Sequence, residues 1–351
     1  MATALSAGGA GGAGGAGGAG RPAADAPLVA VIPVDPILDD EAAAAAAAGL
    51  EVLRFSFVYD VEIEGGGAPS RAPCRGLFRG FMLKGERYRE LYDGLAGLGV
   101  HLVTSPEQYE SVHYYPQAHA KLRAAGAPRA AWAAVAEAAA AADDVDAAVF
   151  DDAVARVRAW PGGASHVVLK DFVKSAKSER PDLLHVAVDG ELGAAARDLV
   201  RARGARFNRG VVFKEYVATR KYAVEMGDSP NEWRLWFGRG ELLCAAPNSL
   251  AALRRDATRV PAEVLTRAAE AARALGAPFL TIDVAEATED VRWRPETDDE
   301  EAPRADGAGA GDDGDAAARW FVLEAGAGSV SGPAVEQDLE QLWRALATCF
   351  T

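Results

Sequence analysis

FLTIDVAE (residues 279–286) and RWFVLEAGAGSVSG (319–332) are two apolar stretches, each with one carboxylate inside it, Asp283 in the first and Glu324 in the second; the first also ends in Glu286. Short apolar runs predict buried β-strands, and we expect an acidic loop to join these two as a hairpin. Carboxylates on adjacent strands repel each other unless a positive group lies between them. Mg²⁺, which one or two carboxylates hold together with nucleotide phosphates, is the natural candidate. The alternative is that one carboxylate only caps a turn in solvent.

A second segment, HVVLKDFVKSAKSE (166–179), concentrates positive charge at the end of an apolar strand. The three lysines are Lys170, Lys174 and Lys177. Phosphate oxygens are the usual reason for so compact a cationic site. A basic surface loop is the alternative, because charge runs are usually solvated.

Two further segments predict strands. In NEWRLWFGRGELLC (231–244), Glu232 and Arg234 are two residues apart and therefore share one face of the strand. They either pair with each other or line a cleft, and the pattern favours neither interpretation. GVVFKEYVATRKY (210–222) predicts another strand from its apolar run.

Alternating strand and helix patterns predict a mixed α/β (α+β) fold. We expect a disordered Gly/Ala tail (1–27), an N-terminal α/β domain (28–127), an Ala-rich helical connection (128–160) and a second domain (161–345) with a disordered acidic insertion (295–318). An organelle presequence is the alternative for the tail. Within the N-terminal domain, LFRGFML (77–83) predicts a strand and Ser105 predicts a helix N-cap.

Composition narrows the function. The chain has 351 residues and a formal net charge of −14, which argues against a protein that grips nucleic acid, because phosphate backbones are bound by Lys and Arg. No apolar run is long enough to predict a membrane span. Cys74, Cys244 and Cys349 show no paired spacing, which fits a reducing compartment and predicts a cytoplasmic protein.

In their order and separation, the four segments resemble the ATP-grasp superfamily: a lysine strand, a strand ending in an apolar-x-Glu-Tyr-Val pattern, an arginine strand and a D…E hairpin, together covering about 160–335. The closer resemblance is to the ATP-grasp clade named for two arginines and a lysine. It rests on RGFML (79–83), TSPEQY (104–109), KDFVKS (170–175) and the Glu-to-Ser-Gly ending (324–332). This resemblance implies an ATP-grasp fold, with a small N-terminal domain and two subdomains that clasp ATP.

The resemblance also implies a nucleotide site. Lys170 looks like the strand lysine that meets the phosphates, with Lys174 and Lys177 as helpers in the loop that follows. The backbone of Glu215-Tyr216-Val217 would hold the adenine edge. Glu232 or Glu225 would take the ribose hydroxyls.

The remaining roles concern the transferred phosphoryl group. Arg234 resembles the strand arginine that faces this group or the substrate carboxylate. Arg79 resembles the N-terminal arginine of the clade, which would face the cleft between domains. Asp283 and Glu324 resemble the carboxylates that hold Mg²⁺, with Mn²⁺ as the alternative ion. The family usually has Asn two residues after the metal-binding Glu, whereas this chain has Gly326. Water can complete a Mg²⁺ shell, since this ion keeps several waters.

The implied reaction is ADP-forming ligation, in which ATP activates an unknown carboxylate as an acyl phosphate that an amine or thiol then attacks. The partners expected are ATP and these substrates, with no nucleic acid and no membrane. A nucleotide-binding regulatory module without catalysis is the main alternative, motivated by Gly326. Phosphoryl transfer to a group other than a carboxylate, and an unrelated interaction protein, are the others.

Overall fold

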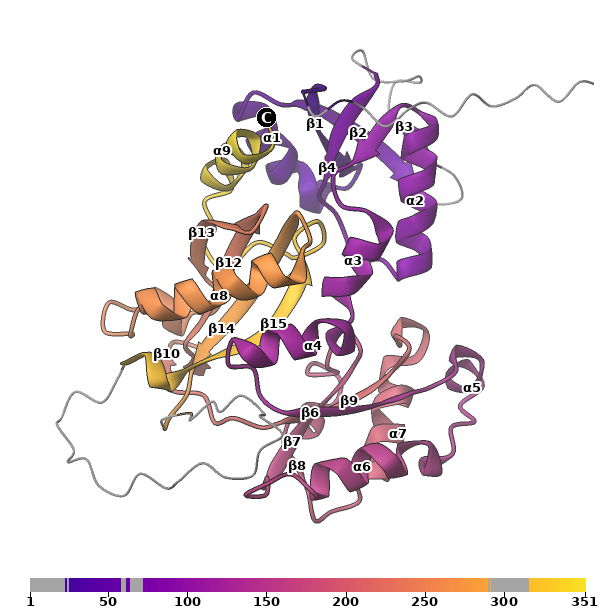
Figure 1. The fold of residues 1–351 in the computed structure, drawn as a ribbon, viewed down its shortest axis with the longest axis vertical. Helices are drawn as coiled ribbons and strands as arrows, with labels where there is room; N and C mark the ends of the chain where they lie inside the picture. Colours follow the sequence, from indigo (N-terminus) through magenta and orange to yellow (C-terminus); the bar gives the residue numbers. More distant parts are fainter. Residues whose placement is uncertain (1–22, 24, 58–60, 64–71, 290, 292–315) are drawn as a thin grey trace, which may run out of the picture.

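A computed structural model describes residues 23, 25–57, 61–63, 72–289, 291 and 316–351. The described part of the chain has three larger β-sheets, stacked along its long axis and each flanked by helices, and a separate two-stranded ribbon (Figure 1). The predictions of a disordered tail over 1–27 and a disordered insertion over 295–318 lie outside these residues, apart from a few positions at their inner ends.

The first sheet has the order β3-β2-β1-β4-β5, parallel except for β3. Its strands are β1 (Leu28–Pro33), β2 (Glu51–Phe57), β3 (Val61–Ile63), β4 (Cys74–Phe78) and β5 (Val100–Leu102). Its helices are α1 (Asp39–Ala47), α2 (Gly85–Gly97), α3 (Pro106–His113) and α4 (Tyr115–Ala124). Ser105 caps α3 as predicted, in a reciprocal capping box with Gln108.

The strand predicted over 77–83 is wrong in its extent, because β4 ends at Phe78. Two residues later the chain has left the sheet: the N–H of Gly80 donates to Ser329 O at 2.9 Å. A long-range contact that no local pattern reveals therefore ends this strand.

The second sheet is antiparallel, in the order β13-β12-β14-β15. Its strands are β12 (Glu232–Gly238), β13 (Glu241–Pro247), β14 (Phe279–Glu286) and β15 (Trp320–Ala327), and β14 and β15 form the expected hairpin. The ribbon β10 (Lys221–Val224) and β11 (Gly227–Pro230) precedes it, α8 (Ala262–Leu275) packs on it, and α9 (Leu339–Phe350) packs against α1.

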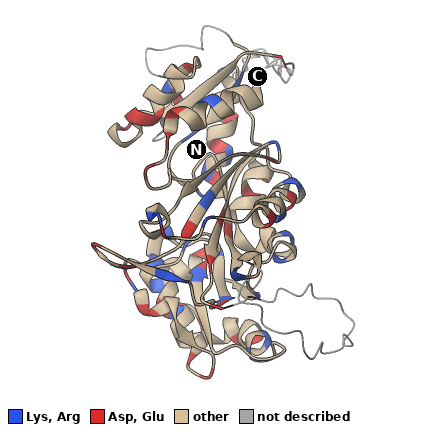
Figure 2. Cartoon of the chain, turned by 90° about the vertical axis from the view of Figure 1, so that its left-hand side faces the viewer, with Lys and Arg blue, Asp and Glu red and all other residues tan. Residues whose placement is uncertain are grey.

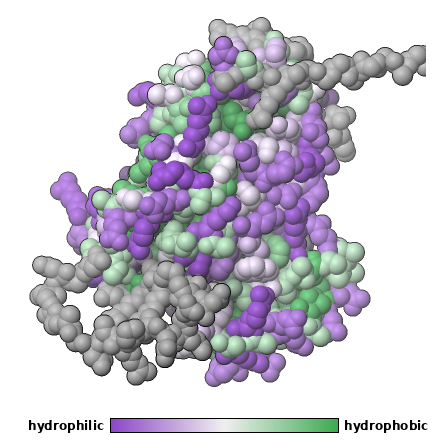
Figure 3. Space-filling model, viewed as in Figure 1, coloured by the Kyte–Doolittle hydropathy of each residue, from purple (hydrophilic) through white to green (hydrophobic). Residues whose placement is uncertain are grey.

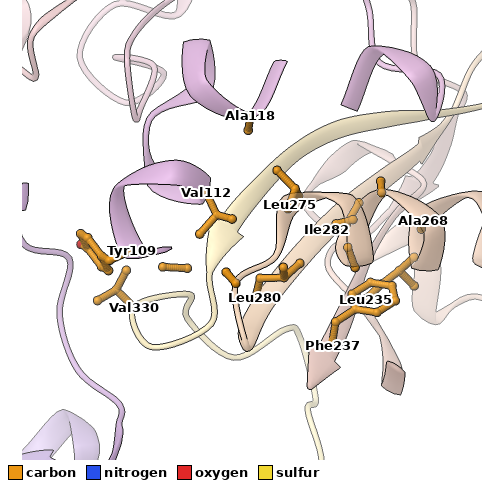
Figure 4. Close-up of a cluster of buried hydrophobic side chains, with 14 of the residues drawn as sticks. Tyr109, Val112, Ala118, Leu235, Phe237, Ala268, Leu275, Leu280, Ile282 and Val330 are labelled. Carbon is orange, nitrogen blue, oxygen red and sulfur yellow. The ribbon is translucent and has the colours of Figure 1, made fainter. Parts of the chain in front are cut away.

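The hydrophobic core continues from the N-terminal helices into this second sheet. Figure 4 shows side chains from α3, α8, β12 and β14 packed together: Tyr109, Val112, Ala268, Leu275, Leu235, Phe237, Leu280 and Ile282. Removing apolar surface from water is the main stabilising term in folding. We therefore expect this shared core to hold the N-terminal helices against the second sheet.

The third sheet has the order β6-β9-β7-β8 and is also antiparallel. Its elements are β6 (Ala130–Ala134), α5 (Glu137–Ala141), α6 (Asp151–Arg158), β7 (His166–Asp171), β8 (Val186–Ala187), α7 (Leu192–Arg203) and β9 (Gly210–Glu215). The helical connection predicted over 128–160 is wrong at Ala130–Ala134, which form β6. Pairing with β9, where Ala131 lies opposite Phe213, overrides the helix preference of alanine.

Within the described ranges, no helix is long and apolar enough to cross a membrane. On the face drawn in Figure 3, hydrophobic residues form small groups among hydrophilic ones. Figure 2 shows that residues of both charge signs are distributed along the described part of the chain.

Candidate functional site

A cleft of about 360 Å³ lies between the sheet of β7 and β9 and the sheet of β12, β14 and β15. Its volume is within the range of small-molecule sites. It brings together most of the residues predicted from the sequence: Lys170, Lys174, Lys177, Glu215, Tyr216, Val217, Glu232, Arg234, Asp283 and Glu324.

Lysines from one sheet reach a carboxylate of the other across this cleft. Lys170 Nζ lies 2.6 Å from Glu324 Oε2, and Lys174 Nζ lies 4.0 Å from Glu324 Oε1. Burial alone would raise the pKa of Glu324, but the charges of Lys170 and Lys174 hold it well below its usual range. Glu324 is therefore ionised, and the lysines present their charge where the two sheets meet.

Lys214 is a site residue that the sequence analysis missed. It lies on β9, and the pairing of Val168 with Lys214 puts it on the same sheet face as Lys170. Its Nζ donates to Leu323 O and lies 5.5 Å from the centre of the Tyr115 ring. Burial and the charge of Lys170 lower the pKa of Lys214 to about 7. The available signal was a lysine within an otherwise apolar strand, but its meaning depends on the pairing register.

Arg234 pairs with Asp283 directly across from it in the sheet. Its Nε and Nη2 lie 2.8 and 2.7 Å from the two carboxylate oxygens of Asp283. The register continues from Asp283 to Glu324, so an arginine and two carboxylates lie in one row over three strands. Arg234 therefore compensates Asp283 as Lys170 compensates Glu324.

The predicted ribose contacts differ in their placement. Glu232 lines the cleft, and burial together with the nearby charge of Asp283 raises its pKa to about 7. Glu225 lies in the turn between β10 and β11 and is not among the cleft residues. The geometry thus favours Glu232 of the two.

The segment expected to hold adenine lies at one wall of the cleft. The carboxylate of Glu215 is bound by Arg129, with contacts of 2.6 and 2.9 Å. The N–H of Tyr216 donates to His166 O at 3.0 Å, which anchors the segment to β7. Because the Glu215 side chain is already paired with Arg129, a ligand here would form hydrogen bonds with main-chain groups, as the family resemblance implies.

Asp283 and Glu324 fit a divalent cation as a pair of adjacent carboxylates that open on the same cleft. A third ligand side chain at Gly326 would be crowded: a Cβ there would lie 2.9 Å from Ser331 Oγ and 3.2 Å from Thr281 Oγ1, so these hydroxyls would have to move. No cluster of three or more His, Cys, Asp or Glu with metal-binding geometry occurs in the part of the chain that the structure describes. Water or phosphate oxygens would have to complete such a shell.

Arg79 does not line the cleft, contrary to the role expected for it. It is 3% exposed and forms a buried ion pair with Glu41 of α1. Its guanidinium also donates to Gly328 O and to Ser331 O, the latter at 2.6 Å, and lies over the Trp236 ring at 5.0 Å. Arg79 thus fastens the first sheet to the loop after β15.

A smaller cavity of about 70 Å³ adjoins the cleft and is lined partly by that same loop. The two share Lys174, Arg234, Asp283 and Glu324. His113 also lines the small cavity, where burial lowers its pKa to about 3 and keeps the ring uncharged. A ligand in the small cavity would therefore lie beside whatever occupies the charged end of the cleft. We call this smaller cavity the acceptor cavity.

The second and third sheets enclose a cleft that has lysines on one side and paired carboxylates on the other. Lysines gathered in this way are typical of sites that bind phosphate groups. Residues 158–294 match the family model for the ATP-grasp domain of family 3 in the clade named for two arginines and a lysine. This part of the chain is therefore an ATP-grasp domain, and the family and fold class expected from the sequence are confirmed. No curated protein matches the sequence significantly.

Solved structures share the architecture at low sequence identity. The D-cycloserine synthetase DcsG is 16% identical, with a TM-score of 0.54 over 92% of this chain and 100% of that one. The D-alanine-D-alanine ligase from Coxiella burnetii is 11% identical, with a TM-score of 0.51 over 92% and 94%. The ATP-grasp ligase PsnB, 14% identical with a TM-score of 0.45 over 92% and 98%, is known in complex with a minimal precursor, Mg and ADP. At these identities the first two structures establish the fold only.

Proposed function

We propose that this protein is an ATP-dependent, ADP-forming carboxylate–amine (or carboxylate–thiol) ligase. The observation that carries the proposal is the row Arg234–Asp283–Glu324, which faces Lys170 at the junction of the cleft and the acceptor cavity. Nucleotide and acceptor would meet at this row. Its positive groups suit the oxygens of a phosphoryl group that is transferred from ATP to the acceptor, and its carboxylates suit the metal ion that accompanies the phosphates.

The first step would join the acceptor carboxylate to the terminal phosphoryl group. An oxygen of the carboxylate attacks the γ-phosphorus, the bond to the bridging oxygen breaks, and ADP leaves with that electron pair. Lys170, Lys214 and Arg234 would lie near the negative charge of the phosphoryl oxygens, and cations in that position lower the barrier to transfer. In the second step an amine or thiol attacks the acyl carbon, the bond from that carbon to the phosphate oxygen breaks, and phosphate leaves with the electron pair. The proton of the nucleophile passes to the leaving phosphate or to water.

Asp283 and Glu324 would hold Mg²⁺, or Mn²⁺ in its place. When bound, such an ion neutralises phosphate charge and orients the nucleotide. These carboxylates pair with Arg234 and Lys170, so a cation held here would share them with these basic groups. Lys174 and Lys177, which are further from the row, would contribute charge at the phosphates.

The runner-up is a nucleotide-binding module with little or no catalysis. It is favoured by Gly326, which supplies no ligand side chain where the family usually has asparagine, and by the ion pairs that both carboxylates form. A module of this kind would bind ATP and release no ADP.

A screen for ADP release tests the ligase proposal. Pairs of carboxylates and amines are incubated with Mg²⁺ and ATP, and ADP is measured by a coupled assay. We expect ADP formation that requires both acceptors and falls on the order of 100-fold in Arg234→Met, since one lost electrostatic contact costs about that much. Lys121→Met, at an exposed position on α4, is the matched control and should retain full activity. ATP binding without ADP release from any pair would support the runner-up.

A further inference from the structure

A second cavity, of about 230 Å³, opens at the carboxyl edge of the first sheet. The chain leaves β1 toward β2 on one side of the sheet and later returns to β4 on the other. The ends of these two parallel strands diverge at such a switch point, and small ligands commonly bind there in open α/β sheets. Pro33 from β1 and Phe78 from β4 line the cavity.

The cavity is mainly apolar. Its wall includes Phe55, Phe78 and Phe81, while Asp35 and Ser56 are the polar side chains on it. Phe81 is 46% exposed and Val34, which also lines it, is 52% exposed. Large apolar side chains gathered at one opening indicate a surface that contacts a ligand.

The segment that follows β4 forms part of the wall of both this cavity and the acceptor cavity. Met82 lines the acceptor cavity, whereas Phe81 and Leu83 line the apolar one. Hydrogen bonds hold the segment in place: the N–H of Gly80 donates to Ser329 O at 2.9 Å, and the Tyr109 hydroxyl donates to Leu83 O at 2.7 Å. The two cavities therefore lie on either side of residues 81–83, and the side chains of Phe81 and Met82 are both partly exposed.

We propose that the cavity at the β1–β4 edge is an apolar subsite for the acceptor carboxylate of the ligase reaction. The carboxylate would lie near Lys174 and Arg234 in the acceptor cavity, and an uncharged aliphatic or aromatic group would extend past Phe81. Asp35 on the wall disfavours a second carboxylate at that end. The substrate class is thus a monocarboxylate with an apolar tail. This inference rests on the proposed function.

A homologous series of linear monocarboxylates, from acetate to octanoate, tests the subsite by calorimetry with Mg²⁺ and a non-hydrolysable ATP analogue present. We expect affinity to rise roughly fourfold per methylene that enters the cavity, from the free energy of burying one CH₂ group. Ser56→Trp should fill the cavity and abolish the gain, and Phe81→Ser, at a half-exposed position, should reduce it. Ser165→Trp, an exposed serine near β7, is the matched control.

Two results would overturn the subsite. One is an affinity that does not depend on chain length in the wild type. The other is a chain-length gain that Ser56→Trp and Phe81→Ser both leave intact, which would place the tails elsewhere. A separate titration of Mg²⁺ and ATP without carboxylate distinguishes these results from a failure of the proposed function. Tail-dependent binding without nucleotide binding would keep the subsite and reject the ligase.

Discussion

Replacing Arg79 by methionine should destabilise the fold and leave nucleotide binding intact. Arg79 forms a buried ion pair with Glu41, and Trp343 donates to Glu41 at 2.8 Å. The guanidinium also holds the carbonyls of Gly328 and Ser331. The variant loses all the contacts of the guanidinium at once, although none of them lies in the cleft.

The magnitude follows from burial on both sides of the pair. Both side chains are almost fully excluded from solvent, at 3% and 4% exposure. Breaking a buried pair by removing one partner costs about 3–5 kcal/mol, because the other charge stays buried without compensation. Glu41→Gln should have a similar cost. The double variant should lose less than the two single losses combined, since neither charge then remains.

The pH dependence has a defined sign. Burial would raise the pKa of Glu41, but the charge and hydrogen bonds of Arg79 hold it below its usual value. A carboxyl whose pKa is lower in the folded state stabilises the fold above its unfolded pKa of about 4.3, and that contribution is lost as the pH falls through the folded value. Arg79→Met should therefore flatten the acid limb of the stability profile.

Urea unfolding monitored by tryptophan fluorescence measures these losses. Arg89→Met, which removes an exposed pair with Glu107, is the matched control and should change the free energy of unfolding little. An Arg79→Met variant that unfolds at the wild-type urea concentration would show that the buried pair with Glu41 does not stabilise the fold. If it also loses nucleotide binding, Arg79 belongs to the site after all.

Three further outcomes follow from the structure. Phosphates near Lys214 should raise its pKa from about 7, so ATP binding should take up protons and should weaken above that pH. Calorimetry in buffers of different ionisation enthalpy measures this proton uptake, and Lys214→Met should abolish it. Gly326→Asn should destabilise by about 1–3 kcal/mol, because the new Cβ meets the Ser331 hydroxyl at 2.9 Å, and Ser331→Ala should restore part of the loss in urea unfolding; a fully stable Gly326→Asn would contradict the crowding. Ser105→Ala should cost about 1 kcal/mol through loss of the α3 cap, measured as a shift in urea midpoint, and no shift would mean that the cap contributes nothing.

The sequence predicts many of the cleft residues because they are charged positions within apolar strands, such as Arg234 in β12, Asp283 in β14 and Glu324 in β15, where local patterns are informative. The pairing of Asp283 with Glu324 follows from two apolar runs and the loop between them. Lys170 is likewise visible as a lysine delivered by an apolar strand.

The errors have a common physical cause: they depend on contacts between distant segments. Arg79 looks like a cleft residue until its partners on α1 and after β15 are known. The role of Lys214 depends on the register between β7 and β9, and β6 exists because β9 offers a free edge to an alanine-rich segment. Tertiary pairing decides each of these against local propensity.

The proposal that the cleft binds ATP is tested by calorimetry, in which ATP and Mg²⁺ are titrated into the protein. The proteins compared are the wild type, Lys170→Ala, Glu324→Ala and the control Lys121→Met. We expect binding in the wild type and in the control, and weaker binding in both cleft variants, because Lys170 and Glu324 lie on opposite walls of the proposed nucleotide site. Circular dichroism establishes that each variant is folded. A folded wild type that binds no ATP, or cleft variants that bind it as tightly as the wild type, would contradict a nucleotide site in this cleft.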